Sequence, residues 1–248
     1  MTRFSANLGF LYTDRNLPDA IHAAHEAGFD AVECHWPYDT PAGDVRAAIE
    51  ATGLPMLGLN TVRGHSGENG LCALPGREAE AHAAIDQAIA YADAIDAGAI
   101  HVMAGFAQGS EAQAVYEQNL RLACTSTDRM IVIEPLNRHD APNYFLQTTD
   151  QARAIIEKLG LPNLRLMFDC YHVGRTEGDV MTRLTDLLPI IGHIQFASVP
   201  DRGPPDQGDL NYAAIFEHIQ SLGWANPLGA EFRPPKDQSH PWMRTFTT

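Results

Sequence analysis

The chain is poor in cysteine and in positive charge, and it lacks long apolar runs. No apolar stretch approaches the roughly 18 residues that a membrane-spanning helix requires, and the first residues lack the apolar core of a signal peptide. The four cysteines form no C-x-x-C pair, which argues against a disulfide framework or a zinc site; they are Cys34, Cys72, Cys124 and Cys170. We therefore expect a cytoplasmic protein with reduced thiols and no membrane partner.

Positive charge is scarce relative to negative charge. The 17 Lys and Arg residues against 31 Asp and Glu residues give a net charge of −14, and such a surface repels the phosphates of nucleic acids. The chain also shows no glycine-rich nucleotide-binding fingerprint. We therefore expect neither a nucleic-acid partner nor a nucleotide cofactor, and the sequence leaves open whether the chain forms a homo-oligomer.

What the chain does contain is a repeated alternation of short apolar segments and helical patterns. The strand-like segments end near Asn7, Glu33, Asn60, Met103, Glu134, Asp169, Gln195 and Glu231. Helical patterns cover residues 17–28, 45–51, 76–97, 111–124, 148–159, 178–188, 211–222 and 237–245. We expect Pro18 in the first turn of the first helix, and Thr148 or Thr149 as the N-cap of the fifth. The alternation, the 248 residues and the 45% hydrophobic content predict a single α/β domain over residues 1–248, a (β/α)8 TIM barrel.

Four consecutive strands in the second half of this pattern end in a side chain with an oxygen ligand. Glu134 follows the apolar run of residues 131–133, and Asp169, Gln195 and Glu231 end the next three strands, on average about 32 residues apart, close to one eighth of the chain. In a barrel these ends meet at one mouth, where three buried carboxylates would repel one another unless a cation compensates. Any one acid taken alone would be interpreted as a helix N-cap or an ion-pair partner. The set of four predicts a divalent metal site, with Mg²⁺ favoured, Mn²⁺ as the alternative, and zinc disfavoured by the all-oxygen ligands.

Two of these carboxylates also suit proton transfer. Glu134 and Glu231 end the fifth and eighth strands, so they would flank a bound substrate. A metal that polarises a carbonyl and an adjacent hydroxyl acidifies the C–H bond between them. One carboxylate then removes that proton, and the other returns a proton to the neighbouring carbon. The arrangement predicts an isomerase or epimerase that works through an enediolate.

Six separated segments, in order, resemble the hydroxypyruvate isomerase family within the xylose-isomerase-like barrels. They lie at residues 3–7, 73–78, 133–137 (IEPLN), 168–172 (FDCYH), 192–195 (GHIQ) and 202–212. The resemblance implies the same proton-transfer pair, Glu134 and Glu231, and the same four metal ligands. The resemblance implies conversion of hydroxypyruvate to 2-hydroxy-3-oxopropanoate. The ketose epimerases have histidine at the position of Gln195, so this residue favours the hydroxypyruvate isomerase branch. A similar branch isomerises 2-oxo-tetronates, and one sequence does not separate the two.

Hydroxypyruvate carries a carboxylate, so a cation is expected near the metal, and Arg202 in the loop after the seventh strand is the leading candidate. His172 is expected to hydrogen-bond a substrate oxygen, and Asn7 and Asn60 to shape the pocket from the ends of strands one and three. His193 shares the alternation phase of Gln195 and should point inward as a packed histidine. Trp36 is expected to pack near the pocket. His65 and Glu68, in the long loop of residues 61–75, are a hypothesis for closing over the substrate.

Other functions remain open from the sequence. The nearest alternatives are a 2-oxo-tetronate isomerase and a ketose 3-epimerase of the same fold. An endonuclease-type barrel would need a basic groove and a histidine-rich metal cluster, against which the net charge of −14 and the oxygen ligands argue. A barrel that binds a sugar acid without catalysis predicts the loss of one of the two glutamates, and both are present.

Overall fold

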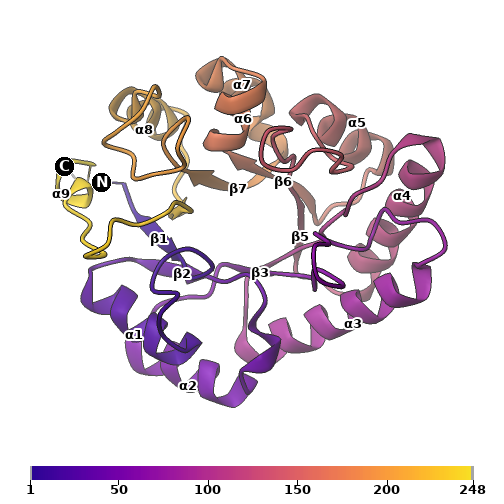
Figure 1. Ribbon diagram of the computed structural model, residues 1–248, viewed down its shortest axis with the longest axis horizontal. Helices are drawn as coiled ribbons and strands as arrows, with labels where there is room; N and C mark the ends of the chain where they lie inside the picture. The colour runs from indigo at the N-terminus through magenta and orange to yellow at the C-terminus, as the bar shows by residue number, and fades with distance from the viewer. Residues whose placement is uncertain (1, 247–248) are drawn as a thin grey trace.

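Within the described part of the chain, eight short parallel strands form one sheet that closes into a barrel, with helices around it (Figure 1). The computed structural model describes residues 2–246. The strands are β1 (Phe4–Asn7), β2 (Ala31–Glu33), β3 (Gly58–Asn60), β4 (Ala99–His101), β5 (Met130–Ile133), β6 (Leu164–Asp169), β7 (Ile191–Phe196) and β8 (Leu228–Ala230). Strands β2 and β3 close the ring through a parallel bridge between Val32 and Met56 and a 2.7 Å hydrogen bond from the Leu57 N–H to the Val32 carbonyl. The predicted TIM barrel is confirmed.

The helices alternate with the strands along the chain. They are α1 (Leu17–Glu26), α2 (Ala42–Thr52), α3 (Glu78–Ile95), α4 (Gly109–Ser126), α5 (Thr149–Leu159), α6 (Cys170–Thr176), α7 (Val180–Leu187), α8 (Tyr212–Ser221) and α9 (Trp242–Phe246), with short 3₁₀ turns η1 (Pro37–Asp39) and η2 (Leu188–Ile190). The expected start signals are confirmed, since Pro18 lies in the first turn of α1 and Thr148 caps α5 by accepting from the Gln151 N–H. No helix among residues 2–246 is long and apolar enough to cross a membrane.

Alternation along the strands separates an outer apolar layer from a polar barrel interior. Outward positions such as Phe4, Ile131 and Phe168 belong to the large core between sheet and helices. Near the termini, which lie side by side in Figure 1, Trp242 of α9 packs edge-on against Phe4 at 4.9 Å between ring centres. Inside the barrel a small cluster of Ala99, Val132 and Met167 is the apolar floor, and polar side chains lie between this floor and the mouth.

The sequence did not predict helix α6. It begins directly after β6 without a loop, because the carboxylate of Asp169 caps it by accepting a 2.8 Å hydrogen bond from the Tyr171 N–H. The two expected strand ends Glu134 and Glu231 lie one residue beyond β5 and β8. The last helix begins at Trp242 instead of near Asp237, whose side chain accepts hydrogen bonds from Ser239 in a turn.

Candidate active site

A cluster of buried acids lies at the carboxyl ends of β5, β6 and β8. Glu134, Asp169, Glu231 and His172 each place one potential ligand atom within 4.8 Å of the others. Oε1 of Glu134 and Oδ2 of Asp169 are buried and have no hydrogen-bond partner in the described part of the chain. Unpaired buried oxygens of this kind are costly, so the cluster could hold a cation.

Gln195, the fourth predicted ligand, lies on β7 opposite Asp169 of β6 and lines a second, smaller cavity inside the barrel together with Glu33 and His193. Its Nε2 donates a 3.1 Å hydrogen bond to Oε2 of Glu33, and its Oε1 is buried with no hydrogen-bond partner among residues 2–246. The amide oxygen is therefore the atom left free to bind a cation. With the three carboxylates it makes an all-oxygen donor set, which fits Mg²⁺ or Mn²⁺ better than zinc.

His172 belongs to the cluster by distance but not by its protonation pattern. Asn137 donates to its Nδ1 through both the backbone N–H, at 2.9 Å, and the side-chain amide, at 2.8 Å. The amide orientation follows because Oδ1 of Asn137 accepts from the backbone N–H groups of His139 and Asp140. In its neutral form His172 therefore carries its proton on Nε2, 3.6 Å from Asp169 and 3.8 Å from Glu134. That nitrogen is a hydrogen-bond donor, not a metal ligand.

Glu231 has the most polar partners of the three carboxylates. Its Oε1 lies 2.9 Å from Nε2 of His35 and accepts from the side-chain amide of Asn7 at 3.2 Å. Its Oε2 accepts from Arg202 at 2.5 Å. Gly9 makes this arrangement possible, since a Cβ there would lie 2.1 Å from the His35 ring.

The environments of the carboxyl groups push their pKa values apart. Burial and the charges of Glu231 and Asp169 raise the pKa of Glu134 well above its ordinary value. Burial, followed by the charge of Glu231, raises the pKa of Asp169 to about 7 against the lowering effect of Arg202. Burial opposes ionisation of Glu231 too, but Arg202 and His35 outweigh it and hold the pKa of that carboxyl well below its ordinary value. Unequal protonation of neighbouring carboxyls is typical of acid–base sites.

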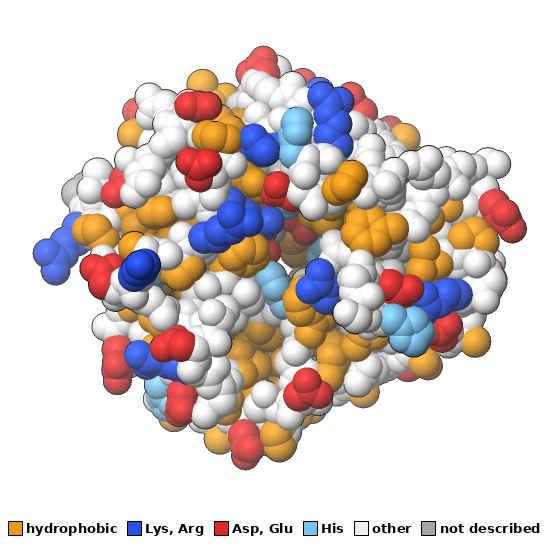
Figure 2. Space-filling model, in the orientation of Figure 1, with side chains coloured by type: hydrophobic (Ala, Val, Ile, Leu, Met, Phe, Trp, Pro, Cys, Tyr) orange, Lys and Arg blue, Asp and Glu red, His pale blue; other side chains and the backbone are white. Residues whose placement is uncertain are grey.

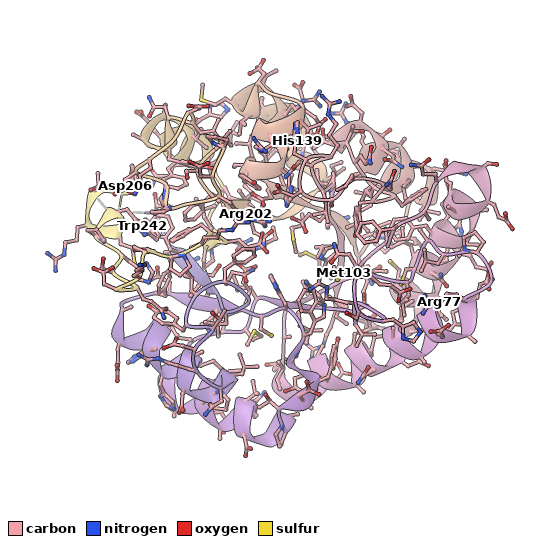
Figure 3. All side chains as sticks on the ribbon, viewed as in Figure 1. Arg77, Met103, His139, Arg202, Asp206 and Trp242 are labelled. Carbon is pink, nitrogen blue, oxygen red and sulfur yellow. The ribbon has the colours of Figure 1, made fainter. Side chains whose placement is uncertain are left out.

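Arg202 is fixed between two aromatic rings. Its guanidinium carbon lies 4.5 Å from the ring centre of Phe10 and 4.9 Å from that of Tyr171, both within cation–π range. Besides Glu231, it reaches Asp169 at 3.8 Å. Figure 3 shows Arg202 pointing toward the centre of the barrel, with Met103 across the opening from it. The guanidinium therefore balances part of the negative charge of the cluster.

A cavity of about 300 Å³ opens over the cluster. Figure 2 shows this face of the molecule hollowed at its centre, with charged and histidine side chains around the hollow. The polar lining comes from His35, Asn60, Arg63, Asn69, His101, Glu134, Asp140, His172, Arg202 and Glu231, and the larger apolar lining residues are Phe10, Trp36, Met103 and Leu136. The cavity is large enough for a small organic acid.

The structure brings together most residues that the sequence singled out. Glu134, Glu231, His172, Arg202 and Asn60 line the cavity, and Asn7 contacts Glu231. Their proposed roles stay predictions. His193 points inward as expected, with its Nε2 2.9 Å from Glu33, and Trp36 lines the cavity and donates from Nε1 to the Thr61 carbonyl at 3.1 Å.

Within the loop of residues 61–75, different residues reach the cavity from those expected. His65 and Glu68 are absent from its lining, because Glu68 accepts from the His65 N–H at 2.6 Å and pairs with Arg77 on the outer side. Arg63 and Asn69 line it instead.

Sequence reasoning also missed Glu33, His35 and His101. Glu33 ends β2, so the rule that selected Glu134 would have found it, whereas His101 ends β4 two residues before the strand end that the sequence predicted near Met103. His35 follows Glu33 by two residues. His101 is buried, its Nδ1 lies 3.7 Å from Glu134, and burial lowers its pKa to about 4.

The fold and the site define an α/β barrel enzyme with a buried carboxylate cluster at the carboxyl ends of its strands. The model of the xylose isomerase-like TIM barrel family matches residues 21–246. The chain belongs to this family.

Known proteins and structures resemble the chain over almost its whole length. It is 42% identical to a 2-oxo-tetronate isomerase of Cupriavidus necator, over 94% of each chain. It is 40% identical to a human protein named provisionally as a hydroxypyruvate isomerase, over 98% of this chain and 95% of that one. A crystal structure from Brucella melitensis, described as an AP endonuclease of family 2, superposes with a TM-score of 0.95 at 30% identity and 99% coverage of both chains. These similarities identify the chain as an isomerase, as the sequence predicted.

Proposed function

We propose that the protein interconverts hydroxypyruvate and 2-hydroxy-3-oxopropanoate, with Glu134 and Glu231 as the proton-transfer pair. The observation behind this proposal is that these two carboxyls, from β5 and β8, line one cavity of about 300 Å³ and have pKa values displaced in opposite directions. Isomerisation between neighbouring carbons needs two such groups, one that removes a proton and one that returns it.

The reaction balances without a redox cofactor. Removal of a proton from C3 of hydroxypyruvate leaves an enediolate across C2 and C3. A proton returned to C2, with transfer of the C3 hydroxyl proton to the C2 oxygen, gives the aldehyde product. The Nε2–H of His172, directed at the carboxylate cluster, is placed to donate a hydrogen bond to a substrate oxygen.

We propose Glu134, Asp169, Gln195 and Glu231 as the ligands of a divalent cation, Mg²⁺ in preference to Mn²⁺. When bound, it would polarise the carbonyl and hydroxyl oxygens and so acidify the C–H bond. The protein's own part is to hold the ligand oxygens in place. Glu33 orients the Gln195 amide, and Asn7 and His35 orient the Glu231 carboxylate.

An assay in deuterated water with added Mg²⁺ tests this function. We expect solvent deuterium to enter the product, and both Glu134→Gln and Glu231→Gln to lose it together with activity, by about 100-fold or more. Glu157→Gln, on the exposed face of α5, is the control and should behave as wild type. A chelator should abolish activity, and Mg²⁺ or Mn²⁺ should restore it. Full activity in either active-site variant would refute the two-base assignment.

A 2-oxo-tetronate is the second candidate substrate, because the Cupriavidus necator relative carries that activity in its name. Turnover of hydroxypyruvate and of a four-carbon 2-oxo acid, measured side by side, decides between them. The net charge of −14 opposes binding to a phosphate backbone, so we do not extend the description of the Brucella melitensis structure to this chain.

A further inference from the structure

The substrate of the proposed isomerase is an anion, and a negatively charged site must contain something that attracts it. We propose that Arg63, with the amides of Asn60 and Asn69, is the subsite that binds the substrate carboxylate. This inference rests on the proposed function, because it assigns a position to the acid group of that substrate. It also explains how the enzyme would select an acid over a neutral sugar.

Charge distinguishes the two arginines that line the cavity. Among the described residues that line the cavity, two carry a permanent positive charge, Arg63 and Arg202. Arg202 is already engaged, since it pairs with Glu231 at 2.5 Å and reaches Asp169 at 3.8 Å. A substrate carboxylate at Arg202 would compete with two fixed carboxylates for one guanidinium. Arg63 pairs with no carboxylate in the described part of the chain.

Arg63 is held by contacts with Trp36 and with the backbone of its own loop. Its guanidinium carbon lies 4.6 Å from the ring centre of Trp36, and its Nε donates to the Glu68 carbonyl at 3.2 Å. The indole is itself fixed by its hydrogen bond to the Thr61 carbonyl. These contacts use the ring face and Nε, so the two terminal nitrogens remain without a partner among residues 2–246. Two parallel N–H groups of this kind match the geometry of a carboxylate.

The backbone around Arg63 is also held in place. The Arg63 carbonyl accepts from the Gly70 N–H at 2.8 Å, which closes the intervening turn. Gly70 has a φ of +111° and packs on Met103, where a Cβ would lie 2.5 Å from the Met103 carbonyl oxygen. A glycine is therefore required where the loop touches the segment after β4. These contacts therefore hold the backbone of Arg63 in a defined position.

Two side-chain amides line the same cavity as Arg63. Asn60, at the end of β3, and Asn69, in the same loop, line the cavity, and neither side-chain amide has a partner among residues 2–246. Free amide N–H groups in the same cavity as a guanidinium favour an anion. Glu134 and Glu231, by contrast, come from β5 and β8. The substrate would thus place its acid group toward Arg63 and its reacting carbons toward the two glutamates.

Binding of D-glycerate tests the subsite without turnover, because this reduced analogue of hydroxypyruvate cannot isomerise. We expect titration calorimetry with Mg²⁺ present to show binding to wild type, at least about 10-fold weaker binding to Arg63→Gln, and an intermediate affinity for Arg63→Lys. Arg15→Gln is the matched control, since Arg15 is an exposed arginine that lies over Tyr12 outside this cavity. Equal affinities of wild type and Arg63→Gln, or no binding to wild type, would overturn the proposal.

Kinetics distinguish failure of the subsite from failure of the proposed function. With hydroxypyruvate as substrate, we expect Arg63→Gln to raise KM at least about 10-fold and to change kcat less. With neutral dihydroxyacetone as substrate, we expect Arg63→Gln to have the same kcat/KM as wild type. If wild type turns over hydroxypyruvate and Arg63→Gln does so equally well, the subsite is wrong and the function stands. If glycerate binding depends on Arg63 but hydroxypyruvate is not isomerised, the function is wrong and the subsite stands.

Discussion

Glu33 and Gln195 are joined by a buried hydrogen bond of 3.1 Å in the barrel interior, from the amide nitrogen of Gln195 to Oε2 of Glu33. The same carboxylate oxygen lies 2.9 Å from Nε2 of His193, and Oε1 accepts from Ser5 at 3.3 Å. A carboxylate accepts but does not donate, so it can pair only with the NH₂ side of the amide. The contact with Glu33 therefore fixes the amide orientation of Gln195 and leaves its buried oxygen without a hydrogen-bond partner among residues 2–246.

Glu33→Gln is expected to weaken metal binding even though Glu33 is not itself a predicted ligand. An amide at position 33 can donate as well as accept, so the Gln195 amide would lose its fixed orientation. Removal of such supporting contacts typically lowers metal affinity by about 10–100-fold. Titration with Mn²⁺, followed by electron paramagnetic resonance, measures the effect, and Glu26→Gln on the exposed end of α1 is the control. An unchanged Mn²⁺ affinity would show that Gln195 is oriented in another way or is not a ligand.

Gly229→Ala should disturb the same network from β8. A Cβ at this position would lie 2.2 Å from Oε1 of Glu33 and 2.7 Å from Cγ of Gln195, so the side chains must shift. We expect a loss of stability of about 1–3 kcal/mol, as for other overpacked interiors, measured by chemical denaturation. The control is Gly43→Ala in the first turn of α2, where an added Cβ meets no described residue within 4 Å. Equal stability of the two variants would contradict the packing argument.

The sequence predicted the barrel because strand ends are local features. Glu134 is preceded by a β-branched run and followed by Pro135, and Asp169 and Glu231 also end apolar segments. Such signals can be recognised in the sequence without knowing which residues each strand contacts in the fold. The number and order of strands followed from their spacing, which is why the fold and the isomerase class were predicted.

The contacts that give each side chain its environment were not predictable in this way. Glu33 meets His193 across 160 positions of sequence, and His35 meets Glu231 across 196. Those pairs exist only once the barrel closes. The placement of Arg63 depends on a loop whose turns have no periodic pattern, so loop length indicated a functional segment but not which residues face the cavity.

His240 should make stability depend on pH in a region away from the active site. It lies 2.9 Å from the Tyr12 hydroxyl and edge-on to Phe29, and burial lowers its pKa to about 4 against the raising effect of Asp237. Because the folded pKa lies below the unfolded value of about 6.5, the unfolded state binds more protons between these values. This contribution to stability is intact above pH 6.5 and is lost progressively as the pH falls toward 4.

Comparison with His240→Gln isolates this contribution from that of other buried histidines. We expect the difference in unfolding free energy between pH 7 and pH 4.5 to be smaller in His240→Gln than in wild type, as measured by urea denaturation. His25→Gln, on the exposed side of α1, should keep the wild-type pH dependence. Identical pH slopes for His240→Gln and wild type would mean that His240 protonates as easily in the folded chain as in the unfolded one.

Arg202→Gln tests the electrostatic role of the guanidinium between Phe10 and Tyr171. Its 2.5 Å contact with Glu231 favours the ionised carboxylate, so its removal should raise the pKa of Glu231. A group that must be ionised to act then requires a higher pH, and the acid limb of the kcat/KM profile should move upward by about 1–3 pH units. Arg202→Lys, which keeps the charge, should shift it less.

The matched control for Arg202→Gln is Arg138→Gln, in the loop after β5, where the arginine is exposed and absent from the cavity lining. Its pH profile should coincide with that of wild type. If the acid limb stays in place in Arg202→Gln as well, Glu231 does not depend on Arg202 for its ionisation, and His35 at 2.9 Å would be the group that stabilises the carboxylate. The double variant with His35→Gln would then show the shift that Arg202→Gln lacks.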